Sequence, residues 1–389
     1  MFTTIIIFIV ILSILVFAHE IGHFWTARKF GVSCPEFGWG FPPRAIGIYR
    51  PINKAGADES EAPKKSRKWK VVWGSREVDD ADGTVYSINW LPLGGFVKIK
   101  GEQGDSKDET DSFGHQKIWK RCIILSAGVT MNIIIAALFI SLGYMLGLPQ
   151  DLDGVSPAAI VRDRNIQIMQ VLPDSAAANA GVQFGDVILS INNQQFSNYT
   201  QLQAFLADKA GQELDYQLRR GREEFDLAIT PKVLGESDEV GIGVAIAETG
   251  LVSFPWYRAI WEGIKSTVFL IWFIIAAFYG LFRDIFTGVG VSQSLSGPVG
   301  IATITGQMAQ LGFVYLLQFT AILSVNLAIL NYLPFPALDG GRVLFLIIEK
   351  IRGRAVPEKV EAFIHNAGFA LLIFLVILVT YRDITKFFS

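Results

Sequence analysis

Two histidines and a glutamate stand together near the start of the chain, in the sequence HEIGH at residues 19–23. On a helix His19 and His23 are one turn apart, so both imidazoles leave the same face and can share one metal ion, with Glu20 beside it. Two imidazoles and a third protein ligand leave a fourth position on zinc for water, and a neighbouring glutamate can accept a proton from that water. The spacing predicts a hydrolytic zinc site with Glu20 as general base.

The motif ends an apolar run that begins near Phe2 and has no charged residue before His19. Five-residue matches of this kind also arise by chance, and a buried histidine is often packed without binding metal. Ionisable residues at membrane depth are costly, however, and are for that reason usually functional. The combination predicts peptide hydrolysis within a membrane.

A third ligand has to come from another apolar segment, and NYLPFPALDGG at residues 331–341 offers Asp339. The apolar run before it predicts a membrane helix, and Pro334 and Pro336 interrupt helical bonding near its end. Irregular backbone at membrane depth is tolerated where it is buried in protein or lines a wet cavity. Asp339 can also be interpreted as the N-cap of a helix over 342–350. The presence of the HEIGH motif favours Asp339 as a zinc ligand over Asp339 as an N-cap.

HEIGH, the downstream N-x-x-P-x-P-x-L-D-G-G and SGPVGI at residues 296–301 resemble the site-2 protease family of intramembrane zinc metalloproteases, in its bacterial regulator-of-sigma-E branch. The resemblance covers nearly the whole chain and extends to LPLGGFVKIKGE at 91–102 and AGVTMN at 127–132. The family usually has proline where this chain has Val129. That departure leaves the expected metal ligands untouched.

The resemblance implies a set of site residues. The implied ligands of a Zn²⁺ cofactor are His19, His23 and Asp339, and the implied general base is Glu20. Asn331 would help to bind the substrate backbone, and Pro334 and Pro336 belong to the same substrate-binding motif. A buried amide that joins two helices is the alternative for Asn331.

The chain has 389 residues, is 51% hydrophobic and has a formal net charge of −2. This composition favours an integral membrane protein and offers no basic excess for nucleic acid. The first apolar run lacks the basic start and the cleavage site of a signal peptide, so we expect it to stay attached. The segments expected to span the membrane are 3–26, 121–146, 313–333 and 366–381, the last one short.

The distribution of charge predicts which side each loop faces. The loop between the first two spans is rich in Lys and Arg, which makes it cytoplasmic by the positive-inside tendency, although that tendency is weaker for long loops. Basic residues between Arg342 and Lys359 place the connection between the last two spans inside as well. The N-terminus and the loop after the second span then face outward from a bacterial inner membrane.

A fifth apolar run, 266–281, approaches the length of a span. A crossing there would turn the following helix over and carry Asp339 away from His19 and His23. The segment 255–286 combines tryptophans with basic residues, which is typical of a helix at the membrane interface. We therefore expect it to lie along the outer surface.

Residues 155–250 are polar and have short alternating runs typical of strands. PDSAAANAGVQFGDVILSINN within them resembles a PDZ domain of the bacterial protease-associated type. By analogy, VGIGVAIA at 240–247 is the edge strand, and Gly241, Ile242 and Gly243 form a carboxylate loop for an extended peptide or a protein C-terminus. The alternative is that the glycines only punctuate a loop. The family branch often has two such domains, whereas this chain has room for one.

In the first loop, segments 31–49 and 86–101 have strand and glycine-turn character on either side of a charged stretch, 53–82, that we expect to be flexible. In the family these flanks form a membrane-dipping β-structure beside the active site. An exposed strand edge there would offer hydrogen bonds to a substrate drawn out of its helix. An ordinary cytoplasmic hairpin is the alternative.

Cys34 and Cys122 fall on the predicted cytoplasmic side, where thiols stay reduced, so no disulfide is expected. They are conceivable zinc ligands, but a three-ligand site does not need them. His115 and His365 fit no metal spacing and are expected to be surface or helix-flank residues without a role.

The expected fold is an α-helical multispanning membrane protein, with about four transmembrane helices, membrane-associated β-hairpins and one inserted α+β PDZ domain. Its expected parts are an N-terminal membrane half (1–150), the PDZ domain (155–250), an interfacial helix (255–286) and a C-terminal membrane half (296–389).

The expected activity is zinc-dependent cleavage of a single-pass membrane protein in the bilayer, within or near its transmembrane segment. By resemblance, the substrate is an anti-sigma factor or a remnant signal peptide cut by regulated intramembrane proteolysis. One alternative is a catalytically silent scaffold that recruits partners through the PDZ domain, but Glu20 and a full ligand set argue against it. Another is an ion or proton carrier, but the chain lacks the inverted repeats that many transporters have.

Overall fold

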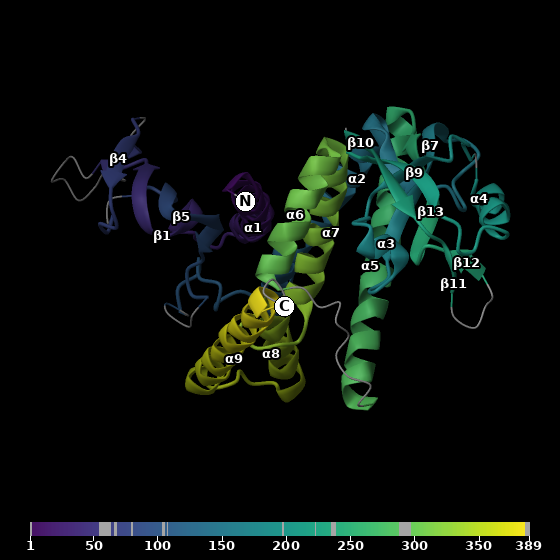
Figure 1. Cartoon of the computed structure of the whole chain (residues 1–389). Coiled ribbons are helices and arrows are strands. Elements are labelled where there is room, and N and C mark those ends of the chain that lie inside the picture. Colours follow the sequence, from purple (N-terminus) through teal and green to yellow (C-terminus); the bar gives the residue numbers. More distant parts are fainter. Residues whose placement is uncertain are drawn as a thin grey trace. The chain divides into compact units, whose positions relative to one another are not determined.

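The computed structural model describes residues 2–53, 64–65, 68–78, 81–102, 106, 108–196, 198–221, 223–234, 239–287 and 297–385 (Figure 1). Nearly half of the charged stretch 53–82, predicted to be flexible, lies outside the described residues, and so does Ser296 of the SGPVGI motif. The chain divides into two units, each described by itself. The first unit is Met1–Ala136, Thr267–Gly306 and Thr320–Ser389, and the second is Ala137–Ser266 and Gln307–Phe319.

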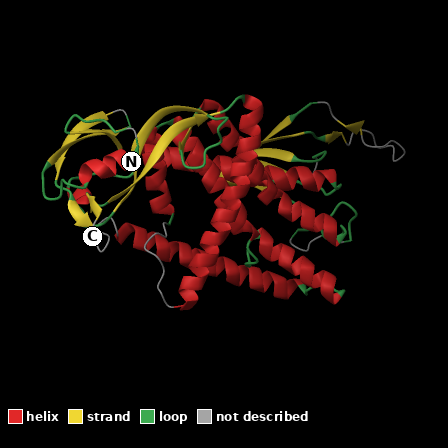
Figure 2. Cartoon of the chain, turned by 90° about the vertical axis from the view of Figure 1, so that its right-hand side faces the viewer, coloured by secondary structure: helices red, strands yellow, loops and turns green. Residues whose placement is uncertain are grey.

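Long helices account for most of the apolar sequence (Figure 2). They are α1 (Phe2–Lys29), α2 (Ile118–Leu146), α5 (Trp256–Thr287), α6 (Pro298–Leu311), α7 (Phe313–Tyr332), α8 (Asp339–Arg352) and α9 (Glu358–Thr385). In the described part of the chain, five of these, α1, α2, α5, α7 and α9, are long and apolar enough to cross a membrane.

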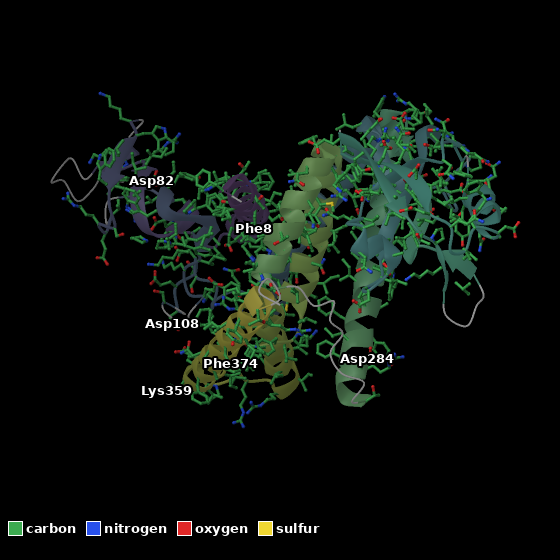
Figure 3. All side chains as sticks on the ribbon, viewed as in Figure 1. Phe8, Asp82, Asp108, Asp284, Lys359 and Phe374 are labelled. Carbon is green, nitrogen blue, oxygen red and sulfur yellow. The ribbon has the colours of Figure 1, made fainter. Side chains whose placement is uncertain are left out.

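The last helix is longer than the predicted span 366–381. It has 28 residues, because a polar first turn extends the helix beyond the apolar run. The carbonyl of Pro357 accepts hydrogen bonds from Val360 and Glu361, and proline is favoured at the start of a helix. Large apolar side chains of α9, such as Phe374, are not covered by other parts of the protein (Figure 3). This is expected of a surface that faces lipid.

The helix α6 begins in the SGPVGI motif and was not expected as a separate element. Its start is fixed by Asp383 near the end of α9, whose carboxylate accepts a hydrogen bond of 2.9 Å from the Gly300 N–H. Gly297 lies so close to Val379 and Asp383 that a Cβ there would clash. The motif therefore joins α6 to α9 within the first unit.

Two glycines bring α1 and α2 together. A Cβ on Gly22 would clash with the backbone of α2, and a Cβ on Gly128 would clash with the histidine rings of α1. Small residues allow such close approach between membrane helices, where packing rather than the hydrophobic effect drives association. The HEIGH segment is thereby held directly against α2.

A three-stranded sheet with the order β4-β1-β5 is built from the first loop. Its strands are β1 (Glu36–Tyr49), β4 (Lys70–Trp73) and β5 (Val85–Lys98), and β2 (Ile52–Asn53) pairs separately with β3 (Lys64–Lys65). The long strands lie where the sequence predicts them. Trp73 and Trp90 on this sheet are 69% and 70% exposed, so it presents aromatic side chains outside the protein core.

The second half of β5 lies along α1. Gly94 and Gly95 approach Val16 and Phe17 so closely that Cβ atoms would clash, and the Gly94 N–H donates to the Ser13 hydroxyl at 3.2 Å. The sheet is therefore packed against the helix that carries the HEIGH motif.

The second unit contains the inserted α+β domain. A six-stranded sheet has the order β10-β9-β8-β7-β13-β6, and β11 pairs with β12. The strands are β6 (Leu148–Asp151), β7 (Ile160–Val171), β8 (Val187–Ile191), β9 (Leu214–Arg220), β10 (Glu223–Ile229), β11 (Lys232–Leu234), β12 (Glu239–Gly241) and β13 (Val244–Ser253), with short helices α3 (Ala176–Asn179) and α4 (Tyr199–Leu206). Ile168, Tyr216 and Leu218 are buried in a core made by this domain alone.

The prediction of an edge strand at 240–247 is only partly right. β13 lies between β7 and β6, because the chain leaving α2 adds β6 against residues 249–252. Residues 244–247 pair with β7 and have no ladder partner on their other side among the described residues, whereas the Glu248 carbonyl accepts a hydrogen bond from the Leu152 N–H just beyond β6. There the Glu248 carboxylate accepts a hydrogen bond from the Tyr199 N–H, which starts α4, at 2.7 Å. A free strand edge beside a helix remains, although it is shorter than expected.

We expect Gly22→Leu to destabilise the protein, because the larger side chain forces α1 away from α2. Overpacking of this kind costs about 1–3 kcal/mol, and a lower thermal midpoint in detergent would report it. The matched control is Gly280→Leu in α5, where a Cβ meets nothing within 4 Å. Equal midpoints for the two variants would contradict the close helix contact.

Candidate metal centre

Three donor atoms from two distant segments converge in the first unit. His19 Nε2 lies 3.0 Å from His23 Nε2 and 3.0 Å from Asp339 Oδ2, and His23 Nε2 lies 3.3 Å from the same oxygen. Tetrahedral zinc with bonds of about 2.0–2.1 Å places its ligand atoms about 3.3 Å apart. The structure thus brings together the three residues predicted as ligands, at separations that fit a single zinc ion. Both histidines are buried.

The second nitrogen of each histidine has a polar neighbour in α2. His23 Nδ1 donates to the Ile124 carbonyl at 2.8 Å, which leaves Nε2 as the ligand atom. His19 Nδ1 lies 3.3 Å from the amide nitrogen of Asn132, while the buried Asn132 Oδ1 has no partner among the described residues. Turning this amide over gives the His19 Nδ1–H its acceptor. Asn132 and Gly128 lie in the AGVTMN motif, but sequence reasoning assigned them no role.

Asp339 is placed by glycines rather than by a helix cap. It is the first residue of α8, and the cap position belongs to Leu338, which makes no side-chain cap hydrogen bond. The interpretation of Asp339 as an N-cap is therefore wrong, because its carboxylate points to the histidines instead. Cβ atoms on Gly340 and Gly341 would clash with backbone carbonyls at the end of α7 and just after it. Close packing there sets where α8 begins.

Glu20 is half-buried beside the histidines. Its carboxylate accepts a hydrogen bond from the backbone N–H of Val97 in β5. The predicted general base is therefore oriented by the sheet as well as by its own helix.

Two ion pairs link α8 to neighbouring parts of the first unit. Arg342, three residues after Asp339, pairs with Glu102 in the loop after β5. Glu349 pairs with Arg121 of α2 at 3.1 Å. Glu102 and Arg342 also line a cavity of about 380 Å³. These contacts join the end of the sheet, α2 and the aspartate-bearing helix.

The predicted substrate-binding residues fall into two groups. In the first unit, Asn331 is half-buried in the last turn of α7, and the motif prolines lie in the irregular segment between α7 and α8. In the second unit, Gly241 ends β12 and Gly243 has a φ of +80° against Ser175. The Ile242 side chain is buried in the domain core, so this residue can offer a peptide only its backbone.

Of the remaining cysteines and histidines, only His365 differs from the prediction. Cys34 and Cys122 are both free thiols, as predicted. Burial raises the pKa of Cys34 to about 12, and neither cysteine joins the one group of metal-binding donors found in the described ranges. His115 is exposed. The prediction for His365 is wrong, because its Nδ1 accepts a hydrogen bond of 2.8 Å from the Ala337 N–H, a contact that sequence spacing does not reveal.

Comparison with known proteins gives concordant matches. The model of peptidase family M50 matches residues 7–51 and 75–375. The regulator of sigma-W protease RasP of Bacillus subtilis is 31% identical over 439 residues, covering 99% of each chain. The zinc metalloprotease RasP of Geobacillus kaustophilus is 28% identical over 99% of this chain and 98% of its own. The resemblance that the motifs indicate is confirmed.

Among solved structures, the PDZ domain of the SdrC-like protein Lmo2051 of Listeria monocytogenes overlaps 22% of this chain and 92% of its own. The sequence identity in this overlap is 20%, and the TM-score is 0.21.

We expect the purified protein to bind about one zinc per chain. Asp339→Ala and His19→Ala should each lose most of it, because each removes one of three ligand atoms. Cys122→Ser is the control and should keep the metal. Zinc-to-protein ratios after dialysis measure this, and full retention by Asp339→Ala would remove the aspartate from the ligand set.

Proposed function

Because the chain belongs to peptidase family M50, we propose that it is an intramembrane zinc endopeptidase that cuts single-pass membrane proteins within or near the transmembrane segment. The observation that carries the proposal is the convergence of His19, His23 and Asp339, with Glu20 beside them, on apolar helices. A water-consuming reaction inside a bilayer needs such a protein-enclosed polar site.

The chain's own residues divide the chemistry among them. When bound, zinc polarises the scissile carbonyl and lowers the pKa of water to about 7. Glu20 accepts the proton of the attacking water and delivers it to the leaving nitrogen, and the Val97 N–H holds its carboxylate in place. The hydrogen bond from His23 to Ile124 keeps the ring in one orientation throughout.

A helical substrate has to be unwound before its carbonyls can be attacked. Residues 95–98 of β5 pair with β1 on one side and reach Glu20 through Val97, so an extended peptide at this sheet would lie beside the base. Asn331, at the end of α7, would bind the substrate backbone. The exposed tryptophans of the sheet suit the membrane interface, where their rings combine apolar and polar contacts.

The class of substrate is inferred from the relatives. The Bacillus subtilis relative is named a regulator of sigma-W protease, and for this chain we infer an anti-sigma factor or a remnant signal peptide. The inserted domain would read the outer part of a substrate, or a protein C-terminus, as a PDZ domain does. The free strand edge at 244–247 beside α4 supports this role.

Contacts within the first unit support the orientation in the membrane that we propose. α1 and α2 run in opposite directions, because His23 faces Ile124 while His19 faces Asn132. The end of α2 is then on the side of Thr4, and Thr4 contacts Gly306 of α6. The chain therefore leaves α2 and enters α6 on the same side of the membrane. The number of crossings between them must then be even, which a single crossing by α5 would violate.

The same side includes the far end of α9. Asp383, which caps α6, is 18 residues beyond His365, about 27 Å along the helix. Basic residues cluster at the opposite end, in the first loop and around α8. By the positive-inside tendency we place the zinc site toward the cytoplasm, and the N-terminus and inserted domain outside.

Glu20→Gln keeps the shape of the site but cannot accept the proton. We expect cleavage of a reporter transmembrane peptide to fall by roughly 10²–10⁴, with zinc content and substrate binding retained. A wild-type rate in a defined detergent assay would refute the general-base role. A silent scaffold, by contrast, would show no cleavage in either protein.

Cysteine labelling tests the orientation in a background without Cys34 and Cys122. An impermeant reagent added to intact cells should label cysteines at Asn198 in the inserted domain and at the exposed Gln307 of α6, and should not label one at Lys359. Labelling of Asn198 without Gln307 would mean that α5 crosses the membrane, and the parity argument would fail.

A further inference from the structure

Every backbone N–H of the segment between α7 and α8 donates a hydrogen bond. Two of its six residues, 333–338, are prolines and have no N–H. The N–H groups of Leu333, Phe335 and Leu338 donate to carbonyls of Leu330, Leu333 and Phe335, respectively. The remaining donor, the N–H of Ala337, has a side-chain acceptor, His365 Nδ1, at 2.8 Å. One side chain thus completes the bonding of this loop.

Ala337 is also the strained residue of the segment. Its φ is +74°, a left-handed conformation that a residue with a Cβ rarely adopts and that the surrounding structure has to impose. Ala337 lies two residues before Asp339. The direction in which the chain leaves Ala337 therefore decides where the Asp339 carboxylate arrives.

His365 is itself held in place from two sides. Its ring centroid lies 5.3 Å from that of Phe345 on α8, and α8 and α9 lie next to each other at the yellow end of the chain (Figure 1). One turn further along α9, a Cβ on Gly368 would clash with Pro336. The helix is therefore pressed against the loop, with the imidazole directed at the Ala337 N–H.

The hydrogen bond defines the state of the ring. An Nδ1 that accepts cannot carry a proton, so the imidazole is neutral with its proton on Nε2. That nitrogen is buried and has no hydrogen-bond partner among the described residues. The histidine therefore acts toward the loop as an acceptor.

We propose that His365 is a positioning residue for the zinc site: its Nδ1 accepts the Ala337 N–H, fixes the left-handed turn there and so places Asp339 opposite His19 and His23. The proposal rests on Asp339 being a ligand, as proposed above. Without the acceptor, the Ala337 N–H has no partner within the protein, and the loop relaxes to conformations that hold the carboxylate elsewhere. His365 does not itself contact the metal or the substrate.

The test measures zinc affinity of the full-length protein by competition with a chelator of known affinity. His365→Phe keeps an aromatic ring but has no acceptor, and we expect its affinity to fall about 10–100-fold, the usual cost of losing a group that orients a ligand. His365→Asn restores an acceptor, since its Oδ1 is as many bonds from Cα as Nδ1 is, and it should stay within about threefold of wild type on that scale. His115→Phe makes the same change at an exposed histidine and should leave the affinity unchanged.

A wild-type affinity in His365→Phe, or an equal loss in His365→Asn, would overturn the proposal, because packing and not the acceptor would then matter. If His365→Phe does not fold, His365→Gln replaces it: its acceptor lies one bond further out, and we expect it to bind zinc more weakly than His365→Asn. Equal affinities for that pair would overturn the proposal as well. Asp339→Ala is measured alongside, since retained zinc there overturns the ligand set and the positioning role together, whereas loss of zinc only there overturns the positioning role alone.

Discussion

Every polar group of this site has to find its partner within the protein, because hydrocarbon offers none. The three donor atoms come from α1 and α8, whose sequence positions differ by 320 residues, and meet within 3.3 Å of one another. Larger side chains at the contacts would keep these segments too far apart for the donor atoms to meet. Glycines remove that obstacle where the backbones touch, at Gly22 and Gly128 between α1 and α2, and at Gly340 and Gly341 at the start of α8.

The same constraint explains how a broken helix is tolerated beside the site. The prolines after α7 remove backbone donors rather than leave them unpaired, and the other N–H groups bond within the loop or to α9. Each backbone N–H of the irregular segment thus has an acceptor, and the segment turns the chain so that Asp339 follows directly. One short sequence therefore contains both the irregular backbone and the proposed third ligand.

The convergence of the three proposed ligands could be predicted from the sequence because their signal is local. His19 and His23 are one helical turn apart in an uncharged run, and Asp339 follows a proline-broken span. His365 and Asn132 could not be predicted as partners of the site, because a hydrogen bond to a backbone N–H or a ring nitrogen from another helix leaves no periodic pattern. The extent of α9 and the position of β6 beside β13 were also missed, since each depends on chain outside the apolar or alternating run. The composition of α5 likewise fits both a helix that crosses the membrane and a helix that lies along its surface.

The first loop contacts both the proposed general base and the helix that begins with Asp339. Its strand β5 gives the Val97 N–H to Glu20, and the residue Glu102, just beyond that strand, pairs with Arg342 on the aspartate-bearing helix. One strand therefore has a contact to the base and, a few residues later, a contact to the helix of the third ligand. A peptide added along this sheet would change the surroundings of both at once. The inserted domain has its own core and contributes none of the donor atoms found among the described residues, so its proposed role in substrate recognition does not require it to supply a ligand.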